Sequence, residues 1–235
     1  MITEAIILAG GFGTRLQKVI QDTPKPMALI NNRPFLEYQI NYLKSFGIKR
    51  IILSVGYLSE QIINHFHNSF NGVEIDYAIE KTPLGTGGGI KLAFEKLLTQ
   101  EAIVVNGDTI FEIDLQDLYK KHKKNNSKFS LALRLVDEVK RYGNVIIDDK
   151  NRILKFAEKG VFSGKGIING GTYIITKDFF KEIPLPNKFS LETDVFEKFC
   201  SSFSFYGFKF EDYFLDIGIP EDYKKAQNEF TELGY

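Results

Sequence analysis

Short apolar runs alternate with amphipathic segments through the first half of the chain. The apolar runs predict buried strands at 2–8, 51–55, 73–79 and 102–106. Between them, apolar residues at helical spacing predict helices at 35–46, 60–66 and 87–98. Strands and helices that alternate in this way predict βαβ units. The expected fold class is therefore α/β, with a doubly wound, mainly parallel, Rossmann-like sheet.

The pattern becomes strand-rich from about Phe129. Strand-like runs lie at 129–136, 144–147, 153–156 and 167–175, and helical spacing returns at 190–199 and 220–233. The segment 122–128 is charged and is interpreted as a connection. Ligands of open α/β sheets bind at the carboxyl ends of the strands. We therefore expect the first half to carry a ligand site and a β-rich insertion to form the other wall of a cleft.

Charge and cysteine content narrow the functional class. Lys+Arg and Asp+Glu both number 30, so no global positive field attracts nucleic acid or an anionic membrane. The single Cys200 cannot form an internal disulfide or a cysteine metal cluster. No apolar stretch reaches the roughly 18 residues that span a bilayer, and no basic segment precedes 2–8. These features predict a cytoplasmic protein without nucleic-acid or membrane partners; a homo-oligomer stays open.

The loop "LAGGFGTRL" follows the first predicted strand and indicates an anion site. A dinucleotide fingerprint would need a third glycine where Leu16 stands, and a Walker A loop would need Gly-Lys-Ser/Thr. A glycine turn without a ligand remains an alternative. Arg15 and Lys25, the latter between two prolines expected to keep it out of a helix, favour a polyphosphate. Backbone N–H groups of the glycines could surround such a ligand.

The loop and "PKPM" at 24–27 resemble the signature of the sugar-1-phosphate nucleotidyltransferases, the NDP-sugar pyrophosphorylases. Further motifs follow in that family's order: "PLGTGGG", "VNGDTIF", "RYGNV", "FAEK", "NGGTY", "SLETD" and "FLDIGIP". The segment "QKVIQDT" departs from the Pro-Leu-Thr type of many dTDP- and UDP-sugar members. This form and the short length are similar to the D-glycero-α-D-manno-heptose 1-phosphate guanylyltransferases, which supply nucleotide-activated heptose for surface polysaccharides.

The resemblance implies one nucleotidyltransferase domain, 1–235, with a nucleotide-binding half at 1–125 and a sugar-binding part with C-terminal helices at 126–235. It implies transfer from an NTP to a sugar 1-phosphate with release of pyrophosphate, with Mg²⁺ as cofactor. The expected metal ligands are Asp108 and Asp216, although each aspartate alone also fits a turn or a helix cap. The expected catalytic residues are Arg15, Lys25 and Asp108.

The resemblance also implies two groups of binding residues. The nucleotide is expected at Leu8, Ala9, Gly10, Gly11, Gly13, Thr14, Arg15, Glu80, Pro83, Gly85 and Thr86. The sugar phosphate is expected at Gly143, Glu158, Lys159, Asn169 and Gly171. Three carboxylates, Glu4, Asp114 and Asp194, are interpreted as solvated or capping charges, and the segment "SLETD" at 190–194 as a further support of the site. The three histidines receive no catalytic role.

Glu80 is expected to select the base of the nucleotide. Thymidylyl and uridylyl members of the family typically have Gln at this position. A carboxylate only accepts hydrogen bonds, and guanine offers two adjacent donors, so Glu80 favours GTP. An ion pair with Lys81 in solvent is the alternative role of Glu80. Other functions left open are a dTDP-, UDP- or CDP-sugar pyrophosphorylase, a non-catalytic nucleotide-binding subunit of the same fold, and a dinucleotide-dependent oxidoreductase.

Overall fold

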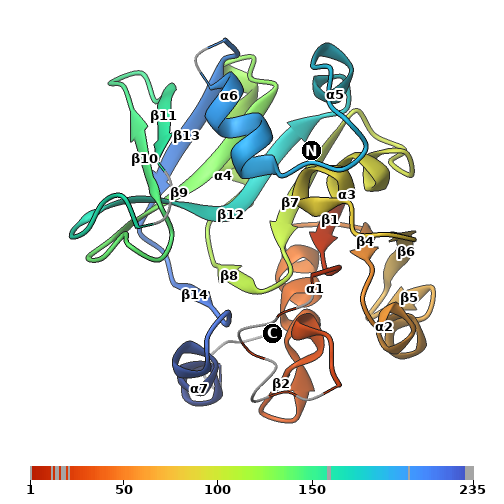
Figure 1. Ribbon diagram of the computed structural model, residues 1–235. Helices are drawn as coiled ribbons and strands as arrows, with labels where there is room; N and C mark the ends of the chain where they lie inside the picture. Colours follow the sequence, from red (N-terminus) through yellow and green to blue (C-terminus); the bar gives the residue numbers. More distant parts are fainter. Residues whose placement is uncertain are drawn as a thin grey trace.

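The computed structural model describes residues 2–11, 13, 16, 20, 22–157, 160–200 and 202–230. Its centre is an eight-stranded sheet with the order β13-β9-β12-β7-β1-β4-β6-β5 (Figure 1). The strands are β1 Glu4–Leu8, β4 Arg50–Val55, β5 Ser69–Phe70, β6 Val73–Ile79, β7 Glu101–Asn106, β9 Phe129–Val136, β12 Gly166–Thr176 and β13 Phe205–Phe210. Only β5 and β12 run antiparallel to their neighbours. The predicted fold class is confirmed.

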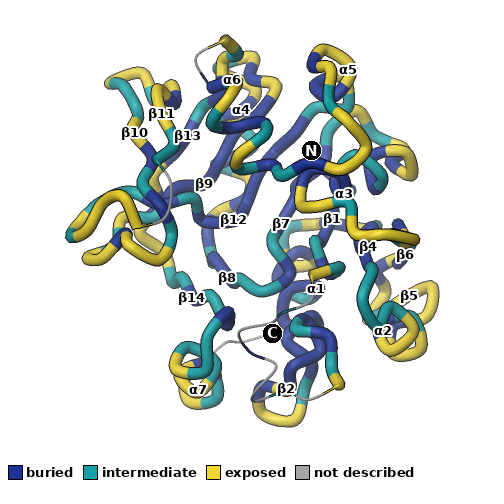
Figure 2. Tube along the Cα trace, viewed as in Figure 1, coloured by how far each residue is buried: buried dark blue, intermediate teal, exposed yellow. Residues whose placement is uncertain are grey.

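Helices cover both faces of the sheet. On one face, apolar side chains of α1 (Phe35–Ser45), α2 (Ser59–Phe66), α4 (Leu115–Lys124) and α7 (Pro220–Glu229) share a core with Ile7 of β1. On the other face, α3 (Gly85–Phe94) and α5 (Phe179–Glu182) share a core with Ile6. A π-helix, Leu191–Phe196, and α6 (Glu197–Phe199) complete that second layer. The strands of the sheet are accordingly buried along most of their length (Figure 2).

Most of the β-rich half extends the central sheet. β9, β12 and β13 continue it beyond β7, whereas β10 (Asn144–Ile147) and β11 (Ile153–Ala157) form a separate hairpin. Two further small pairs are β8 (Thr109–Phe111) with β14 (Phe214–Asp216), and β2 (Leu29–Ile30) with β3 (Arg33–Pro34). Antiparallel β12 brings its amino-terminal half to the edge where the parallel strands β1 and β7 end. The insertion is thus joined to the first half by backbone hydrogen bonds.

Several sequence expectations are wrong in detail. Residue His122 is not part of an open connection, because it is 1% exposed within α4. Glu4 is not a solvated charge: it is 3% exposed and pairs with Arg50 at 2.5 Å. Lys25 begins a short 3-10 helix, Lys25–Met27, despite the flanking prolines. Asp114 does cap a helix, since its side chain accepts hydrogen bonds from the backbone N–H groups of residues 116 and 117.

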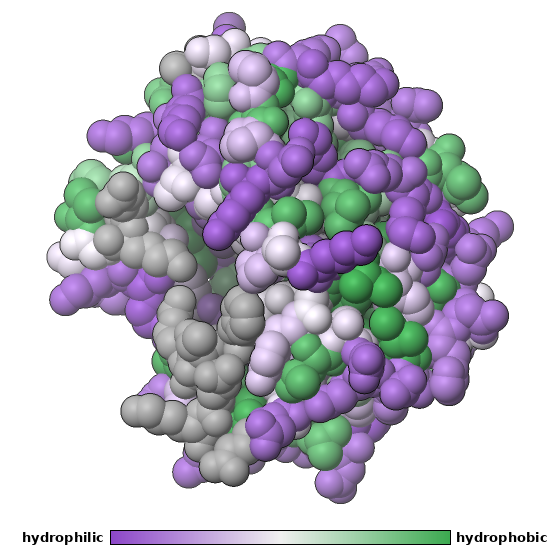
Figure 3. Space-filling model, turned by 45° about the vertical axis from the view of Figure 1, so that its right-hand side comes forward, coloured by the Kyte–Doolittle hydropathy of each residue, from purple (hydrophilic) through white to green (hydrophobic). Residues whose placement is uncertain are grey.

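The outer surface is mixed in character. On the face shown in Figure 3, hydrophobic residues emerge between predominantly hydrophilic ones. Among the described residues, no helix is long and apolar enough to cross a membrane.

Candidate active site

A cleft of about 510 Å³ opens at the carboxyl ends of the four adjacent parallel strands β7, β1, β4 and β6. The segments that follow these strands form one wall, and β12, the π-helix and the turn after β14 form the other. From the first half the cleft is lined by Leu8, Gly10, Gly11, Gly13, Lys25, Pro26, Ser54, Glu80, Pro83, Gly85, Thr86, Asn106, Gly107, Asp108 and Thr109. From the second half it is lined by Arg141, Tyr142, Asn169, Gly171, Glu192, Phe214, Asp216 and Gly218.

The predicted residues mostly meet in this cleft. Thr14, Arg15, Glu158 and Lys159 lie outside the described residues, so their predicted roles stay predictions. Ala9 lies behind the cleft wall, where its N–H donates to the Ser54 carbonyl at 2.7 Å. Gly143 also lies away from the cleft; it has φ +81° and donates to the Val139 carbonyl. Gly143 thus shapes the turn that also contains Arg141 and Tyr142. These two residues, and not Gly143, line the cleft.

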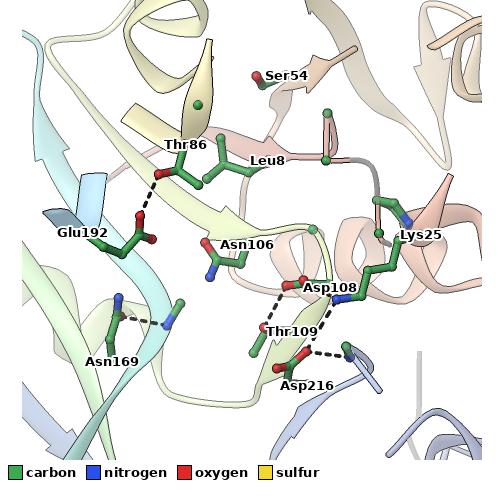
Figure 4. A pocket seen from close by; sticks show the side chains of 18 of the residues that line it. Leu8, Lys25, Ser54, Thr86, Asn106, Asp108, Thr109, Asn169, Glu192 and Asp216 are labelled. Carbon is green, nitrogen blue, oxygen red and sulfur yellow. Dashed lines mark hydrogen bonds and ion pairs between the residues drawn. The ribbon is translucent and has the colours of Figure 1, made fainter. Parts of the chain in front are cut away.

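Lys25 lies between two carboxylates. Its Nζ is 2.5 Å from Asp108 Oδ2 and 3.8 Å from Asp216 Oδ1, and its side chain is 12% exposed (Figure 4). Asp108 follows β7, and Asp216 ends β14, which pairs with β8. Two backbone contacts fix the pair: Ile217 N–H donates to the Asp108 carbonyl, and Gly218 N–H donates to Asp216 Oδ1 at 2.7 Å. Both aspartates therefore face the same end of the cleft.

Two carboxylates and Lys25 set the electrostatics of this end of the cleft. Burial and the nearby charge of Asp108 raise the pKa of Asp216, against the lowering effect of Lys25. Arg141, whose guanidinium pairs with Asp222 at 2.8 Å, contributes a further lowering effect. Like charges held together in a partly buried site are stabilised by an added cation. Within the described residues, no group of three or more His, Cys, Asp or Glu side chains could hold a metal.

The opposite end of the cleft carries Glu80. Its Oε2 accepts a hydrogen bond from the Leu84 N–H at 2.8 Å, and its Oε1 lies 3.4 Å from Ser54 Oγ. Glycines surround Oε1, because a Cβ at Gly10 would lie 3.0 Å from it and a Cβ at Gly89 2.7 Å. The carboxylate is thus oriented by Leu84 and Ser54. The alternative role of Glu80 was an ion pair with Lys81. Among the ion pairs of the described residues, none joins these two side chains.

The glycine-rich start of α3 joins the two walls. The N–H groups of Gly87 and Gly88 donate to the Phe189 carbonyl. A Cβ at Gly85, which has φ +76°, would lie 2.6 Å from that same carbonyl oxygen. The glycines of "PLGTGGG" therefore allow a close approach of backbone from the second half. Gly85 and Thr86 line the cleft at this junction.

Sequence reasoning missed several lining residues, notably Ser54, Arg141 and Glu192. Ser54 lies in a strand whose other residues after Arg50 are apolar and buried, so no sequence pattern pointed to it. Arg141 lies two residues before the predicted Gly143. Its positive charge could have pointed to it, because two polyanionic substrates need cations around them. Glu192 lies in the "SLETD" motif, which was expected to support the site from outside the cleft, without a role for this residue.

Three comparisons agree with this geometry. Residues 4–232 match the family model described as nucleotidyl transferase. The chain is 48% identical to D-glycero-alpha-D-manno-heptose 1-phosphate guanylyltransferase of Aneurinibacillus thermoaerophilus, over 96% of this chain and 97% of that protein. The chain is 49% identical to the Campylobacter jejuni protein of the same name, over 94% of this chain and 96% of that protein. HddC from Yersinia pseudotuberculosis complexed with GMP-PN superposes with a TM-score of 0.86 at 42% identity, over 97% and 100% of the two chains.

Proposed function

This chain belongs to the nucleotidyl transferase family, and we propose that it transfers a guanylyl group from GTP to D-glycero-α-D-manno-heptose 1-phosphate. The names of two relatives at 48% and 49% identity over nearly their whole length support both substrates. The GMP-PN complex of HddC supports a guanine nucleotide. The observation in this chain that carries the proposal is the cleft itself, with a fixed carboxylate at one end and Lys25 between two aspartates at the other.

The proposed reaction joins the two substrates at phosphorus. An oxygen of the sugar phosphate attacks the α-phosphorus of GTP, the bond from that phosphorus to the bridging oxygen breaks, and pyrophosphate leaves. Lys25 is proposed to neutralise charge on the phosphates, and its position between Asp108 and Asp216 in the cleft supports this role. The glycine loop at Gly10, Gly11 and Gly13 lines the same cleft and offers backbone N–H groups to a polyphosphate. Arg15 is proposed to stabilise the leaving pyrophosphate.

Nucleotidyltransferases of this family generally use a divalent metal ion, and we propose Mg²⁺ held by Asp108 and Asp216. The donor set fits, because Mg²⁺ is commonly bound by one or two carboxylates together with substrate phosphates. Burial and the charge of Asp108 raise the pKa of Asp216, and a cation bound between the two carboxylates would lower it again. A bound Mg²⁺ would supply charge neutralisation on the phosphate oxygens.

Glu80 is proposed to select guanine. A carboxylate can accept hydrogen bonds from the guanine N1–H and N2 amino group together, whereas uracil or thymine would present a carbonyl to it. Such an unsatisfied pair costs on the order of 1–3 kcal/mol. The hydrogen bond from Leu84 and the proximity of Ser54 fix the orientation of the carboxylate. Gly10 and Gly89 allow the backbone to approach Oε1 closely, because a Cβ at either position would lie within 3.0 Å of that oxygen.

The proposed product, GDP-heptose, would serve surface polysaccharide biosynthesis, and the proposed location is the cytoplasm, where GTP is available. The test is pyrophosphate release from purified protein with Mg²⁺, GTP and a panel of sugar 1-phosphates. We expect release only when all three are present, and fastest release with the heptose 1-phosphate. Pyrophosphate release that does not depend on any sugar phosphate would overturn the proposal, as would nucleotide binding without turnover.

A further inference from the structure

Glu192 is the acidic residue of the second wall that the proposed reaction does not yet use. It lies in the π-helix Leu191–Phe196, which begins directly after Ser190. π-helical turns are rare and occur frequently at functional sites. Glu192 lines the cleft, and its carboxylate projects beside Thr86, far from Lys25 and Asp108 (Figure 4).

One oxygen of this carboxylate is fixed by the protein. Glu192 Oε2 accepts hydrogen bonds from Thr86 Oγ1 and from Ser190 Oγ, each at 2.8 Å. Thr86 is itself oriented, because its Oγ1 accepts the Leu191 N–H at 2.9 Å. No other described residue donates a hydrogen bond to Oε1. The carboxylate is thus held rigidly with one oxygen available, and a carboxylate oxygen can only accept.

The neighbouring polar residue on this wall, Asn169, uses one donor and one acceptor of its amide within the wall. Its Nδ2 donates to Tyr173 Oη at 2.8 Å, and its Oδ1 accepts the Gly171 N–H at 3.0 Å. Tyr173 is fully buried, so the amide serves the wall itself. The charged acceptor beside Asn169 is Oε1 of Glu192, which receives no hydrogen bond from a described residue. A phosphate would be repelled by this carboxylate, whereas a hydroxyl group would donate to it.

We propose that Glu192 is a specificity-determining residue that accepts hydrogen bonds from hydroxyl groups of the acceptor sugar. This inference rests on the proposed function. The phosphate of the sugar must lie toward Lys25, so the hydroxyls that reach Glu192 are those remote from the phosphate. The ligand class is a polyhydroxylated sugar phosphate. The competing role is an acceptor for the ribose hydroxyls of GTP, because Thr86 lies in the first turn of α3, in the predicted nucleotide motif.

The test compares Glu192→Gln with the wild-type protein in steady-state kinetics. Gln keeps the shape but removes the charge and replaces one acceptor with a donor. Hydrogen bonds to charged groups contribute about 1.5–3 kcal/mol, which corresponds to roughly a tenfold to hundredfold rise in KM for the heptose 1-phosphate. KM for GTP should stay within about twofold. The matched control is Glu182→Gln on α5, an exposed carboxylate paired with Lys128, which should change neither constant.

A rise confined to KM for GTP would assign Glu192 to the ribose and overturn the proposal, as would no change in either constant. If Glu192→Gln fails to fold, Ser190→Ala removes one of the two hydroxyls that orient the carboxylate. That variant should raise KM for the sugar phosphate about twofold to fivefold; an unchanged KM would count against the proposal. Calorimetric binding of heptose 1-phosphate gives an answer even without turnover. A wild type that binds the sugar phosphate more tightly than Glu192→Gln, without catalysis, would refute only the proposed function.

Discussion

At the scale of single residues, the cleft is defined by charges that the backbone holds in place. Lys25 contacts Asp108 closely and Asp216 at longer range, and the Gly218 N–H fixes the second aspartate. A Cβ at Gly218 would lie 2.7 Å from Asp216 Oδ1 and 3.0 Å from Lys25 Nζ. Glycine at this position therefore leaves the space in which the cation and the carboxylate meet.

Removing either aspartate should abolish most of the activity. Asp108→Asn and Asp216→Asn each remove a charge that faces the proposed Mg²⁺ and the triphosphate. We expect kcat to fall at least about a hundredfold in each variant, measured as pyrophosphate release at saturating Mg²⁺. Asp148→Asn is the control and should keep full activity, because Asp148 does not line the cleft that the described residues form, and its carboxylate accepts hydrogen bonds from neighbouring backbone N–H groups. Near-wild-type turnover of both cleft variants would contradict the metal assignment.

Glu80→Gln tests how the base is read. The substitution keeps the size of the side chain but gives it one donor and one acceptor, which suits uracil or thymine. We expect kcat/KM for GTP to fall about tenfold to a hundredfold. The ratio of kcat/KM for GTP to that for UTP or dTTP should fall as well. The measurement is kcat/KM for each nucleotide with the same sugar phosphate. A selectivity that stays equal to that of the wild type would remove Glu80 from base recognition.

Single residues were predictable where they belong to a glycine-rich or charged motif. Lys25, Glu80, Asp108 and Asp216 all line the cleft as the sequence indicated. Ser54 could not be found in the same way, because a serine at the end of an apolar strand carries no pattern of its own. Its role depends on the neighbouring strand β6, which brings Glu80 to within 3.4 Å.

At the scale of elements, α1 supports the turn that carries Asp108. Gln39 on α1 is 2% exposed, and its Nε2 donates to the carbonyls of Asn106 at 2.7 Å and Thr109 at 2.8 Å. These two carbonyls flank Asp108 at the junction of β7 and β8. Gln39 thus acts as a positioning residue for that turn.

Gln39→Leu should loosen this turn. The substitution leaves two partly buried carbonyls without their donor, which costs on the order of 1–3 kcal/mol in the free energy of unfolding. We also expect a lower kcat with KM for GTP changed less, because Asp108 is displaced while Glu80 is untouched. Urea unfolding and steady-state kinetics measure the two effects. Gln61→Leu, which removes an exposed side-chain-to-backbone hydrogen bond, is the control; equal effects of both variants would contradict the positioning role.

The element α4 was missed in the sequence because its lysines obscure a short apolar stripe. Leu115, Leu118 and His122 lie on its buried side at helical spacing, and Asp114 caps it. The histidine reads as polar but is buried, with Nδ1 2.9 Å from Ser130 Oγ. The π-helix was likewise read as an ordinary helix, since a wider turn leaves no mark in the hydrophobic pattern. Such features depend on packing between distant segments.

His122 should make stability depend on pH. Burial lowers the pKa of His122 to about 4, below its usual value near 6.5. Between these values the unfolded chain binds a proton that the folded protein does not, so stability falls as the pH falls. The slope of the unfolding free energy against pH should be smaller in His122→Gln than in the wild type, by up to about 1.4 kcal/mol per pH unit. Urea unfolding between pH 6.5 and 4.5 measures it.

The control for that experiment is His67→Asn. His67 is exposed, so its replacement removes a histidine without opening the core. This variant should keep the wild-type slope. An identical slope in the wild type and in His122→Gln would show that His122 does not couple folding to protons.

At the scale of the whole molecule, the carboxyl and amino ends of the parallel strands carry different groups of residues. The carboxyl edge carries the cleft, and the amino edge carries a charge cluster in which Arg50 contacts Glu4, Glu74 and Asp76. Glu4 also accepts the N–H groups of Leu98 and Thr99. The alternation of strands and helices predicted the sheet correctly. It could not predict this cluster, because Glu4 and Arg50 become neighbours only through the pairing of β1 with β4.

The most direct test of the account is a competition between nucleotides. Wild-type protein, Mg²⁺ and D-glycero-α-D-manno-heptose 1-phosphate are mixed with GTP, ATP, UTP, CTP and dTTP at equal concentrations. The nucleotide-sugar products are then separated and identified by mass spectrometry. The account predicts that GDP-heptose exceeds every other product by about tenfold or more. A dominant UDP-, dTDP- or CDP-heptose, or the absence of any nucleotide sugar, would contradict it.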